Sequence, residues 1–417
     1  MFFIPLLHMS VGVVVRASPE LTLYPAISPL VRVVGRTAQN STSLYFDWSS
    51  VQIHLNAVGP TSVLLDESLH CGMASVCNQY AVFLGPHLLQ RLNTSSGVRE
   101  YPVLLAGQAG LVRIEKITEA SPNTGGVVRF DGVRSALLKA PRPPLQRRVE
   151  CIGDSMMCGA HSERGEAVGS WQFNSTCSNE KRGSNENSYL SWCPTLARAL
   201  GAEYQMECQS GNGLVFTDNP LSAYDCHWGA VPPDCPVMPH SWKRRLMCTA
   251  PGVFMKPDQA CSELVDIDLP LNNTDMFLPH AVIINLGQND FGAGHTPTYT
   301  QWLAGYRNFL HEITSTYASQ NLMAAPRIQF FLACGGMANL YCNDTRTVVQ
   351  DLTADGLFGV HYLDVTAAGA GSANNGTEGC PGTPGSHPSS FSHEHMAALA
   401  EPVVRQAMGW NEITSVV

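Results

Sequence analysis

Short apolar runs separated by turn-forming clusters occupy the first part of the chain. In Val51-Gln52-Ile53-His54-Leu55, apolar and polar residues alternate, which is the period of a strand with one buried face. Comparable runs recur roughly every ten residues, a spacing typical of antiparallel sandwiches. They cover residues 30–34, 43–48, 62–65, 80–84 and 110–117. This pattern predicts a β-sandwich domain over residues 21–142.

The pattern changes after Pro141-Arg142-Pro143-Pro144, a segment that interrupts regular structure and is typical of a linker. Beyond it, apolar strands alternate with helices, an order that predicts a parallel sheet covered on both faces. The strands are expected at 148–152, 202–208, 280–286 and 328–333, and the helices at 188–200, 300–316 and 393–408. We therefore expect an α/β protein whose second domain covers residues 146–412. Within it, the Cys- and Pro-rich stretch 218–269 has no clear period and is predicted to be an insertion.

The apolar run at residues 2–15 is too short to span a bilayer. Val15-Arg16-Ala17 has the small-residue pattern of a signal-peptide cleavage site, although no basic residue precedes the run. We interpret residues 1–17 as a signal peptide; the alternative is a buried first strand. No later segment reaches the length of a membrane span without Pro or charged residues. A secreted, extracellular protein with no stable membrane insertion is expected.

Charged residues make up only 14% of the chain, whereas about 25% is usual in soluble domains. The formal net charge is −9, and no basic block could replace the counterions of a nucleic acid, so we expect no nucleic-acid partner. Acceptor sites for N-linked glycans occur at Asn40, Asn93, Asn174, Asn272, Asn343 and Asn375. Glycans would supply the surface hydration that the low charge does not.

The 14 cysteines, an even and high number, favour an oxidising compartment. None of their spacings forms the paired ladder of a structural zinc site, so no metal is expected. Cys151 and Cys208 lie in predicted central strands and are interpreted as free buried thiols. Three pairs of cysteines are close enough in the sequence to form short-loop disulfides: Cys71/Cys77, Cys226/Cys235 and Cys248/Cys261.

The chemistry of the second domain is indicated first by Gly153-Asp154-Ser155, directly after a predicted strand. Ligands bind at the carboxyl edge of open parallel sheets. Gly153 permits a sharp turn, and the free N–H groups that begin the next helix favour an oxyanion. This is the setting that a serine nucleophile needs.

Three further blocks fit the same edge. Gly211, past the strand at 202–208, can point its N–H into a site without a side chain in the way. Asn289, past the strand at 280–286, can direct its amide N–H₂ at the same oxyanion. His387, before the last helix, can take the proton of Ser155 and return it to a leaving alcohol.

The block order Ser, Gly, Asn, His resembles that of the SGNH (GDSL-type) hydrolases. Other segments look like carbohydrate esterase family 2, and the resemblance covers nearly the whole chain apart from the leader and the insertion. These segments are Val33-Val34-Gly35-Arg36, Phe46-Asp47-Trp48, Leu111-Val112-Arg113-Ile114-Glu115-Lys116-Ile117-Thr118-Glu119-Ala120, Glu186-Asn187-Ser188-Tyr189-Leu190-Ser191 and Ser210-Gly211-Asn212-Gly213.

The resemblance implies a jelly-roll-like β-sandwich followed by an SGNH-type three-layer α/β/α hydrolase domain with a parallel sheet. It implies a serine esterase of the acetyl xylan esterase kind, which removes O-acetyl groups from a polysaccharide or oligosaccharide through an acyl-enzyme, without cofactor or metal. Ser155 would be the nucleophile and His387 the base. The backbone N–H groups of Ser155 and Gly211 and the side chain of Asn289 would form the oxyanion hole.

One departure concerns the orientation of His387. Many SGNH enzymes carry an Asp three residues before this histidine, whereas residues 382–386 here contain no carboxylate. The preferred interpretation is a Ser–His dyad with the imidazole held by a backbone carbonyl. The alternative is a distant acid, Asp364 or Glu378.

Two other functions remain open at this point. One is an SGNH lipase or another acylesterase, against which the sandwich domain argues. The other is a carbohydrate-binding protein whose hydrolase domain is inactive, which the missing acid favours.

Plainer interpretations apply to several conspicuous residues. Asp154 and Asp290 follow Gly-rich turns and are expected to accept local backbone hydrogen bonds. His393 and His395, two residues apart, cannot share a helical face and are not expected to bind metal. Trp48 is expected in the core.

Overall fold

The computed structural model describes the greater part of the chain, in segments separated by gaps. The described residues are 20–67, 77–97, 99–119, 126–163, 185–217, 237–244, 246, 277–292, 296–318, 327–368 and 387–410. The predicted signal peptide and most of the predicted insertion at 218–269 lie outside them.

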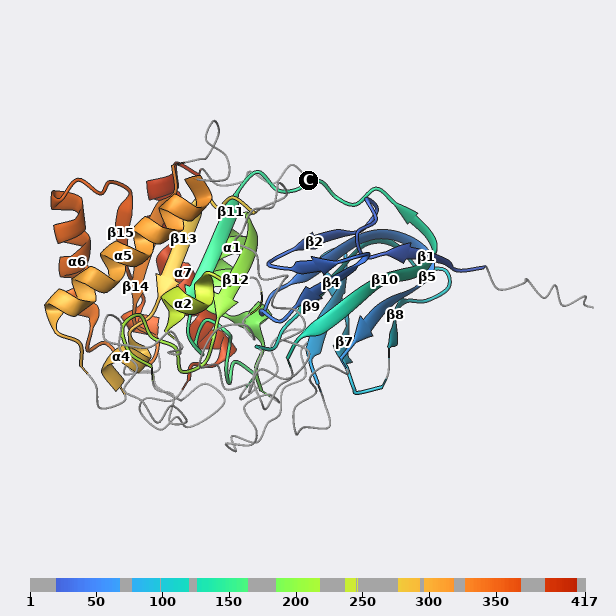
Figure 1. The fold of residues 1–417 in the computed structure, drawn as a ribbon, viewed down its shortest axis with the longest axis horizontal. Coiled ribbons are helices and arrows are strands. Elements are labelled where there is room, and N and C mark those ends of the chain that lie inside the picture. Colours follow the sequence, from blue (N-terminus) through green and yellow to red (C-terminus); the bar gives the residue numbers. More distant parts are fainter. Residues whose placement is uncertain are drawn as a thin grey trace, which may run out of the picture.

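An antiparallel sheet forms the first part of the described chain (Figure 1). Its strands are β1 (Thr22–Pro25), β2 (Arg32–Val34), β3 (Ala38–Asn40), β4 (Ser43–Phe46), β5 (Gln52–Asp66), β6 (Gln79–Leu84), β7 (His87–Asn93), β8 (Glu100–Leu104), β9 (Ala109–Lys116) and β10 (Val128–Lys139). The long strand β5 pairs with β2 and β9 over its first half and with β8 over its second, while β10 follows most of its length. Gly59 lies where the partners change, with a φ of 81° that favours glycine.

The apolar side chains of these strands enclose one core. Trp48 lies within it and is 1% exposed, so the prediction that it is a core residue is confirmed. The alternation of residues 51–55 is confirmed in part: Ile53 and Leu55 are buried and His54 only partly so, but Gln52 is also buried and donates to the carbonyl of Tyr204 in the other sheet.

A parallel sheet forms the second part, in the order β12-β11-β13-β14-β15. Its strands are β11 (Arg148–Gly153), β12 (Glu203–Cys208), β13 (Ala281–Asn285), β14 (Gln329–Cys334) and β15 (Val360–Asp364). The helices are η2 (Ser188–Leu190), α1 (Trp192–Ala199), α2 (Met238–Trp242), α4 (Gln288–Gly292), α5 (Tyr299–Ala318), α6 (Cys342–Ala354), η5 (Thr366–Ala368) and α7 (Ser390–Met408). The expectation of an antiparallel part followed by a parallel α/β part is confirmed.

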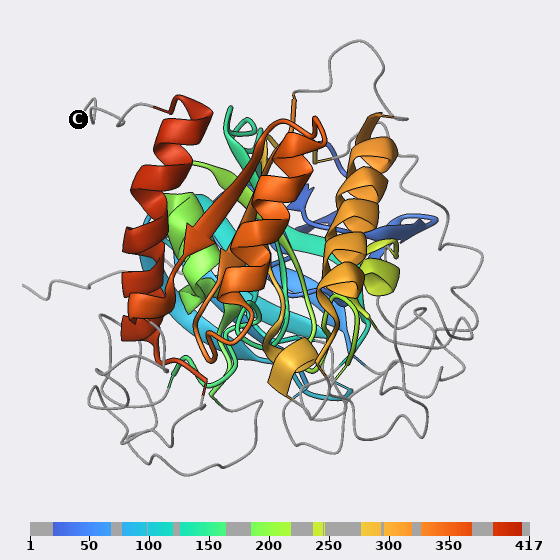
Figure 2. The same ribbon diagram turned by 90° about the vertical axis from the view of Figure 1, so that its left-hand side faces the viewer.

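Helices cover both faces of the parallel sheet. Val149, Cys151 and Ile283 face one core with α1 and α7, whereas Ile152 and Val282 face a second core with α5 and α6. Figure 2 shows α7, in red, and α5, in orange, on opposite sides of the strands. Successive strand residues point to opposite faces, so strands buried on both sides appear in the sequence as continuous apolar runs. None of the helices in the described segments is long and apolar enough to cross a membrane.

Disulfides cross-link the parallel sheet. Cys151 is bonded to Cys193 of α1, and Cys158 to Cys208 at the end of β12. The prediction that Cys151 and Cys208 are free thiols is wrong, because their partners come from segments that only the fold brings alongside. A third bond joins the end of β14 to the start of α6.

The three short-loop pairs predicted from spacing fall mostly outside the described residues. Of their members only Cys77 is described, and it is disulfide-bonded.

A buried ion network joins the two sheets through Arg36, which is 5% exposed. Its guanidinium lies 3.1 Å from Glu150 of β11 and 2.9 Å from Glu207 of β12. It also donates to the backbone carbonyls of Trp242 and Arg244 and lies over the Trp242 ring. Burial raises the pKa of Glu207 well above its usual range, while the charge of Arg36 acts in the opposite direction.

Replacement of Arg36 by Met tests this network. The substitution leaves Glu150 and Glu207 buried without their cation, so the free energy of unfolding should fall by about 3–5 kcal/mol. Urea unfolding measures the loss. The matched control is Arg134→Met, which removes an exposed pair with Glu100 and should cost about 1 kcal/mol or less. Equal losses in the two variants would contradict the assignment.

Candidate active site

The register of the parallel sheet brings three loops to one edge. Gly153, the last residue of β11, is aligned with Cys208 on β12 and with Asn285 on β13. The segments that carry Ser155, Gly211 and Asn289 therefore leave the sheet side by side, at its carboxyl edge. This is the position in which open parallel sheets bind ligands.

The turn that carries Ser155 is tightly constrained. A Cβ on Gly153 would lie 2.6 Å from that of Met157 and 2.9 Å from the carbonyl oxygen of Asn285, so only glycine fits here. After the turn, the N–H of Cys158 donates to the carbonyl of Asp154 at 3.0 Å. The disulfides of Cys151 and Cys158 flank the turn on both sides. Ser155 is thus held on a rigid support and is itself 8% exposed.

His387 lies against this serine. Its Nε2 is 2.7 Å from Ser155 Oγ, a hydrogen bond between residues 232 positions apart in the sequence. The ring of His161 packs edge-on against the His387 ring, with 4.9 Å between ring centroids. The N–H of Ser390, at the start of α7, donates to the carbonyl of Ser162 at 2.9 Å and ties the two segments together.

His393 lies in the first turn of α7, after Ser390, and its side chain is completely buried. Burial, and secondarily the charge of His387, lowers the pKa of His393 to about 3. His393 is therefore neutral beside His387 and does not oppose the positive charge that a general base acquires.

The side chain of Asn289 bridges the two other loops. Its Nδ2 donates to the carbonyl of Asn212 at 2.8 Å and to the carboxylate of Asp154 at 3.3 Å. Gly211, beside Asn212, has a φ of 81° and open space where a Cβ would stand. The loops that carry the predicted oxyanion donors Ser155, Gly211 and Asn289 are thus linked by hydrogen bonds.

Asp154 accepts a local backbone hydrogen bond, as predicted, whereas the prediction of local partners is wrong for Asp290, whose partners lie on a loop distant in the sequence. Asp290 accepts the N–H groups of Leu214, Val215 and Phe216 at 2.6–2.9 Å. Asp154 accepts the Met156 N–H at 3.0 Å. Burial raises the pKa of Asp154 to about 7 and the pKa of Asp290 to about 6.

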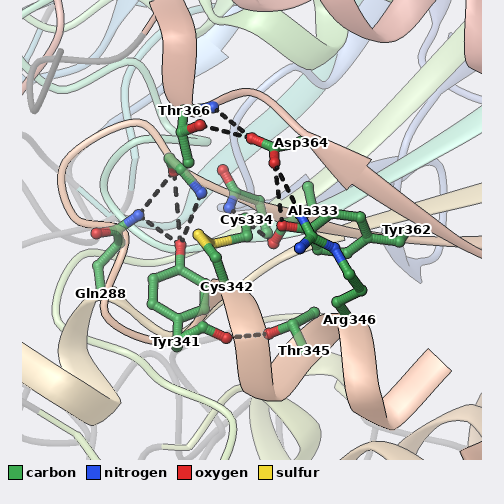
Figure 3. Close-up of a disulfide and its surroundings, with 12 residues drawn as sticks. Gln288, Ala333, Cys334, Tyr341, Cys342, Thr345, Arg346, Tyr362, Asp364 and Thr366 are labelled. Atoms are coloured by element: carbon green, nitrogen blue, oxygen red, sulfur yellow. Dashed lines mark hydrogen bonds and ion pairs between the residues drawn. A yellow bond between two sulfur atoms is a disulfide. The ribbon is translucent and has the colours of Figure 1, made fainter. Parts of the chain in front are cut away.

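Asp364 lies at the end of β15 and is bonded to its neighbours there (Figure 3). Its carboxylate accepts from Arg346 at 3.2 Å, from Tyr362 at 3.4 Å and from the Thr366 hydroxyl at 2.6 Å. Among the described residues, the carboxylate of Asp364 therefore contacts Arg346, Tyr362 and Thr366 and does not contact His387. The other candidate orienter, Glu378, lies outside the described residues.

Two buried acids near the site were not predicted. Glu119 accepts hydrogen bonds from Ser210. Glu163 accepts from Asn187 at 2.6 Å and is paired with Arg91. Glu119 belongs to a segment that carries the family resemblance, but both contacts depend on packing between segments far apart in the sequence, so the sequence alone does not indicate them.

A cavity of about 620 Å³ lies elsewhere, between the two sheets at the amino-terminal end of β12. Its lining includes Arg32, His54, Arg113, Arg142 and Glu203. Burial and these arginines lower the pKa of His54 to about 3. The cavity lies at the opposite end of β12 from the Ser155 edge, so the predicted chemistry is not located there. Among the described side chains, no group of three or more His, Cys, Asp or Glu is placed to hold a metal.

Comparisons with known proteins bear on this geometry. No protein-family model matches the chain. The chain is 27% identical over 322 residues to the cellulase/esterase CelE of Acetivibrio thermocellus, a match that covers 76% of this chain and 32% of the relative. It is 26% identical over 278 residues to the acetylxylan esterase / glucomannan deacetylase of Cellvibrio japonicus, covering 64% of each.

The fold agrees with these sequence matches. The structure of a family two carbohydrate esterase from Clostridium thermocellum in complex with cellohexaose superimposes with a TM-score of 0.67 and 22% identity, covering 91% of this chain and 100% of that one. The resemblance to family 2 carbohydrate esterases is confirmed. The chain spans about a third of the length of one curated relative and about two thirds of the other, 32% and 64%.

The role of Asp364 can be tested by substitution. Because its carboxylate is bonded to Arg346 and Thr366, Asp364→Asn should leave kcat for an acetyl ester within about twofold, whereas His387→Ala should reduce it by three orders of magnitude or more. Initial rates with 4-nitrophenyl acetate measure both. A large loss in Asp364→Asn would show that the histidine depends on this acid.

The raised pKa of Asp154, about 7, predicts a pH dependence of stability. In the unfolded chain this pKa is about 3.9, so between about pH 4 and 7 the native state binds the extra proton and stability falls as pH rises. Asp154→Asn should abolish this contribution, which has a slope of up to about 1.4 kcal/mol per pH unit. Urea unfolding across that range compares the two proteins, and parallel profiles would contradict the prediction.

Proposed function

We propose that the chain is a serine esterase that removes O-acetyl groups from a polysaccharide or glycan. The observation that carries this proposal is the 2.7 Å hydrogen bond between Ser155 Oγ and His387 Nε2, placed at the carboxyl edge of the parallel sheet. A nucleophile and a base in this contact are what acyl transfer requires. Both relatives are esterases by name, one a cellulase/esterase and the other an acetylxylan esterase / glucomannan deacetylase, which supports the same class.

In the proposed reaction, His387 Nε2 takes the proton of Ser155 as Oγ attacks the acetyl carbonyl carbon. The negative charge on the carbonyl oxygen is met by the N–H groups of Ser155 and Gly211 and by the amide of Asn289. Collapse of the tetrahedral intermediate expels the sugar oxygen, which receives the proton from His387. Water then repeats the sequence on the acetyl-enzyme and releases acetate. Each oxyanion donor should contribute about 2.7–4 kcal/mol of transition-state stabilisation.

The substrate is proposed to be an acetylated polysaccharide or oligosaccharide. Support comes from the relative named as an acetylxylan esterase / glucomannan deacetylase and from the similar structure solved with cellohexaose. No resident metal or organic cofactor enters the proposed chemistry.

We further infer that the protein is secreted and glycosylated. The disulfides of the parallel sheet fit an oxidising compartment. Asn40, Asn93 and Asn343 are exposed, as glycan acceptors must be. The remaining acceptor sites, Asn174, Asn272 and Asn375, lie outside the described residues.

We also infer two domains, 21–142 and 146–412, of which the first is a jelly-roll-like sandwich. The two sheets share no strand among the described residues, and β5 changes its partners at Gly59, as a strand that contributes to two layers does. These observations support the division without fixing the jelly-roll connections.

Acetate release from a panel of acetylated glycans tests the proposed function. Wild type should release acetate from at least one of them, and Ser155→Ala should lose about three orders of magnitude or more of that rate. A preference for 4-nitrophenyl octanoate over acetate would favour a lipase. Absence of acetate release, together with no labelling of Ser155 by a fluorophosphonate, would point to an inactive binding protein, because an unactivated serine does not react.

A further inference from the structure

A carboxylate from the antiparallel sheet reaches the Gly211 loop. Glu119, which follows β9, is 2% exposed. Its Oε2 accepts the backbone N–H of Ser210 at 2.7 Å, and its Oε1 accepts the Ser210 hydroxyl at 2.6 Å. Ser210 immediately precedes Gly211. Both oxygens of one buried side chain therefore hold the residue next to an oxyanion donor.

This contact complements tethers on the other side of Gly211. The Thr217 hydroxyl donates to the carbonyl of Gly211 at 2.9 Å. Asn289 donates to the carbonyl of Asn212 at 2.8 Å. Gly211 itself has the wide conformational freedom of glycine, and a Cβ there would meet nothing within 4 Å. The direction of its N–H thus depends on the residues bonded before and after it.

Glu119 is itself held by residues of the antiparallel sheet and of the segment before η2. The Lys116 ammonium donates to the carbonyls of Thr118 and Asp47, which fixes the backbone leading to Glu119. The N–H of Glu119 donates to the carboxyl of Glu186. Burial, and secondarily the charge of Glu119, raises the pKa of Glu186 well above its usual range, which favours the neutral form of Glu186 beside Glu119.

The same segment connects to the nucleophile. Asn187, which follows Glu186, donates its N–H to the carbonyl of Gly159 at 3.1 Å and accepts the Ser162 hydroxyl at 3.1 Å. Gly159 and Ser162 belong to the stretch that follows Ser155. One buried cluster at the end of β9 therefore contacts both the Gly211 loop and the segment after the nucleophile.

We propose that Glu119 is a positioning residue for the oxyanion hole, through which the antiparallel sheet sets the Gly211 N–H relative to Ser155. Glu119 does not touch the reacting atoms in this proposal; it acts through Ser210. The inference rests on the proposed esterase function, and it assigns to the N-terminal sheet a part in catalysis rather than only in glycan binding or packing.

Kinetics of Glu119 variants test the proposal. Glu119→Ala frees Ser210, so kcat for 4-nitrophenyl acetate should fall by about 10- to 100-fold while KM changes by less than about twofold, as expected for a group that acts only in the transition state. Glu119→Gln should stay within about threefold of wild type, because its amide can accept the Ser210 N–H and donate to the Ser210 hydroxyl.

The matched control is Asp66→Ala. Asp66, at the end of β5, is also 2% exposed, but its carboxylate pairs with Arg99 and Arg129 of the antiparallel part. This variant should lower Tm and leave kcat unchanged, which separates loss of stability from loss of positioning. A kcat of Glu119→Ala equal to wild type, or a similar fall in Asp66→Ala, would overturn the inference while the esterase function stands.

Two further measurements keep the test decisive. If Glu119→Ala does not fold, Ser210→Ala removes only the hydroxyl bond and should lower kcat about threefold; an unchanged kcat would overturn the proposal.

If wild type hydrolyses no acetyl ester, the proposed function fails, and amide hydrogen exchange of residues 209–214 decides instead. Faster exchange in Glu119→Ala than in wild type supports the positioning, and equal exchange overturns it.

Discussion

The site depends on the in-register alignment of three parallel strands. Gly153 is paired in register with Cys208 on β12 and with Asn285 on β13. The loops that follow β11, β12 and β13 must therefore lie at one edge of the sheet. A shift of one residue in either pairing would also turn every side chain of the strand to the opposite core. Since both cores are tightly packed with alternate residues, the same packing that stabilises the fold determines where the reactive groups meet.

That alignment requires many polar groups to be buried at the sheet edge and between the sheets. The structure satisfies them by contacts between distant segments: Asp290 accepts three backbone N–H groups, and Glu119 accepts two groups of Ser210. Between the sheets, Arg36 and Lys116 supply buried positive charge opposite buried acids. Such groups are costly when one partner is lost, so these contacts couple the two sheets.

Much of the parallel part was predictable because its central strands are buried on both faces. β13 is a continuous apolar run for this reason, whereas β15 is a half-buried edge strand and was not predicted. Helix α6 was missed as well, since its sequence is mostly polar. Ser155 and His387 were found from short blocks next to expected elements. The disulfide partners of Cys151 and Cys208 and the contact of Glu119 were not, because each depends on packing between distant segments.

The absence of a carboxylate shortly before His387 is consistent with an active base. An orienting acid holds the imidazole in place and stabilises its protonated form. In this structure the ring of His161 packs against that of His387, and the hydrogen bond from Ser390 to Ser162 ties the start of α7 to the segment after Ser155. His393, buried and neutral, adds no opposing charge. In the proposed dyad, packing would contribute to the orientation of the imidazole, and the developing oxyanion, whose proposed donors lie on the adjacent loops, would help to stabilise the imidazolium. The proposed dyad would therefore depend more on the geometry of the oxyanion hole than a triad does, and the residues that fix this geometry would gain importance accordingly.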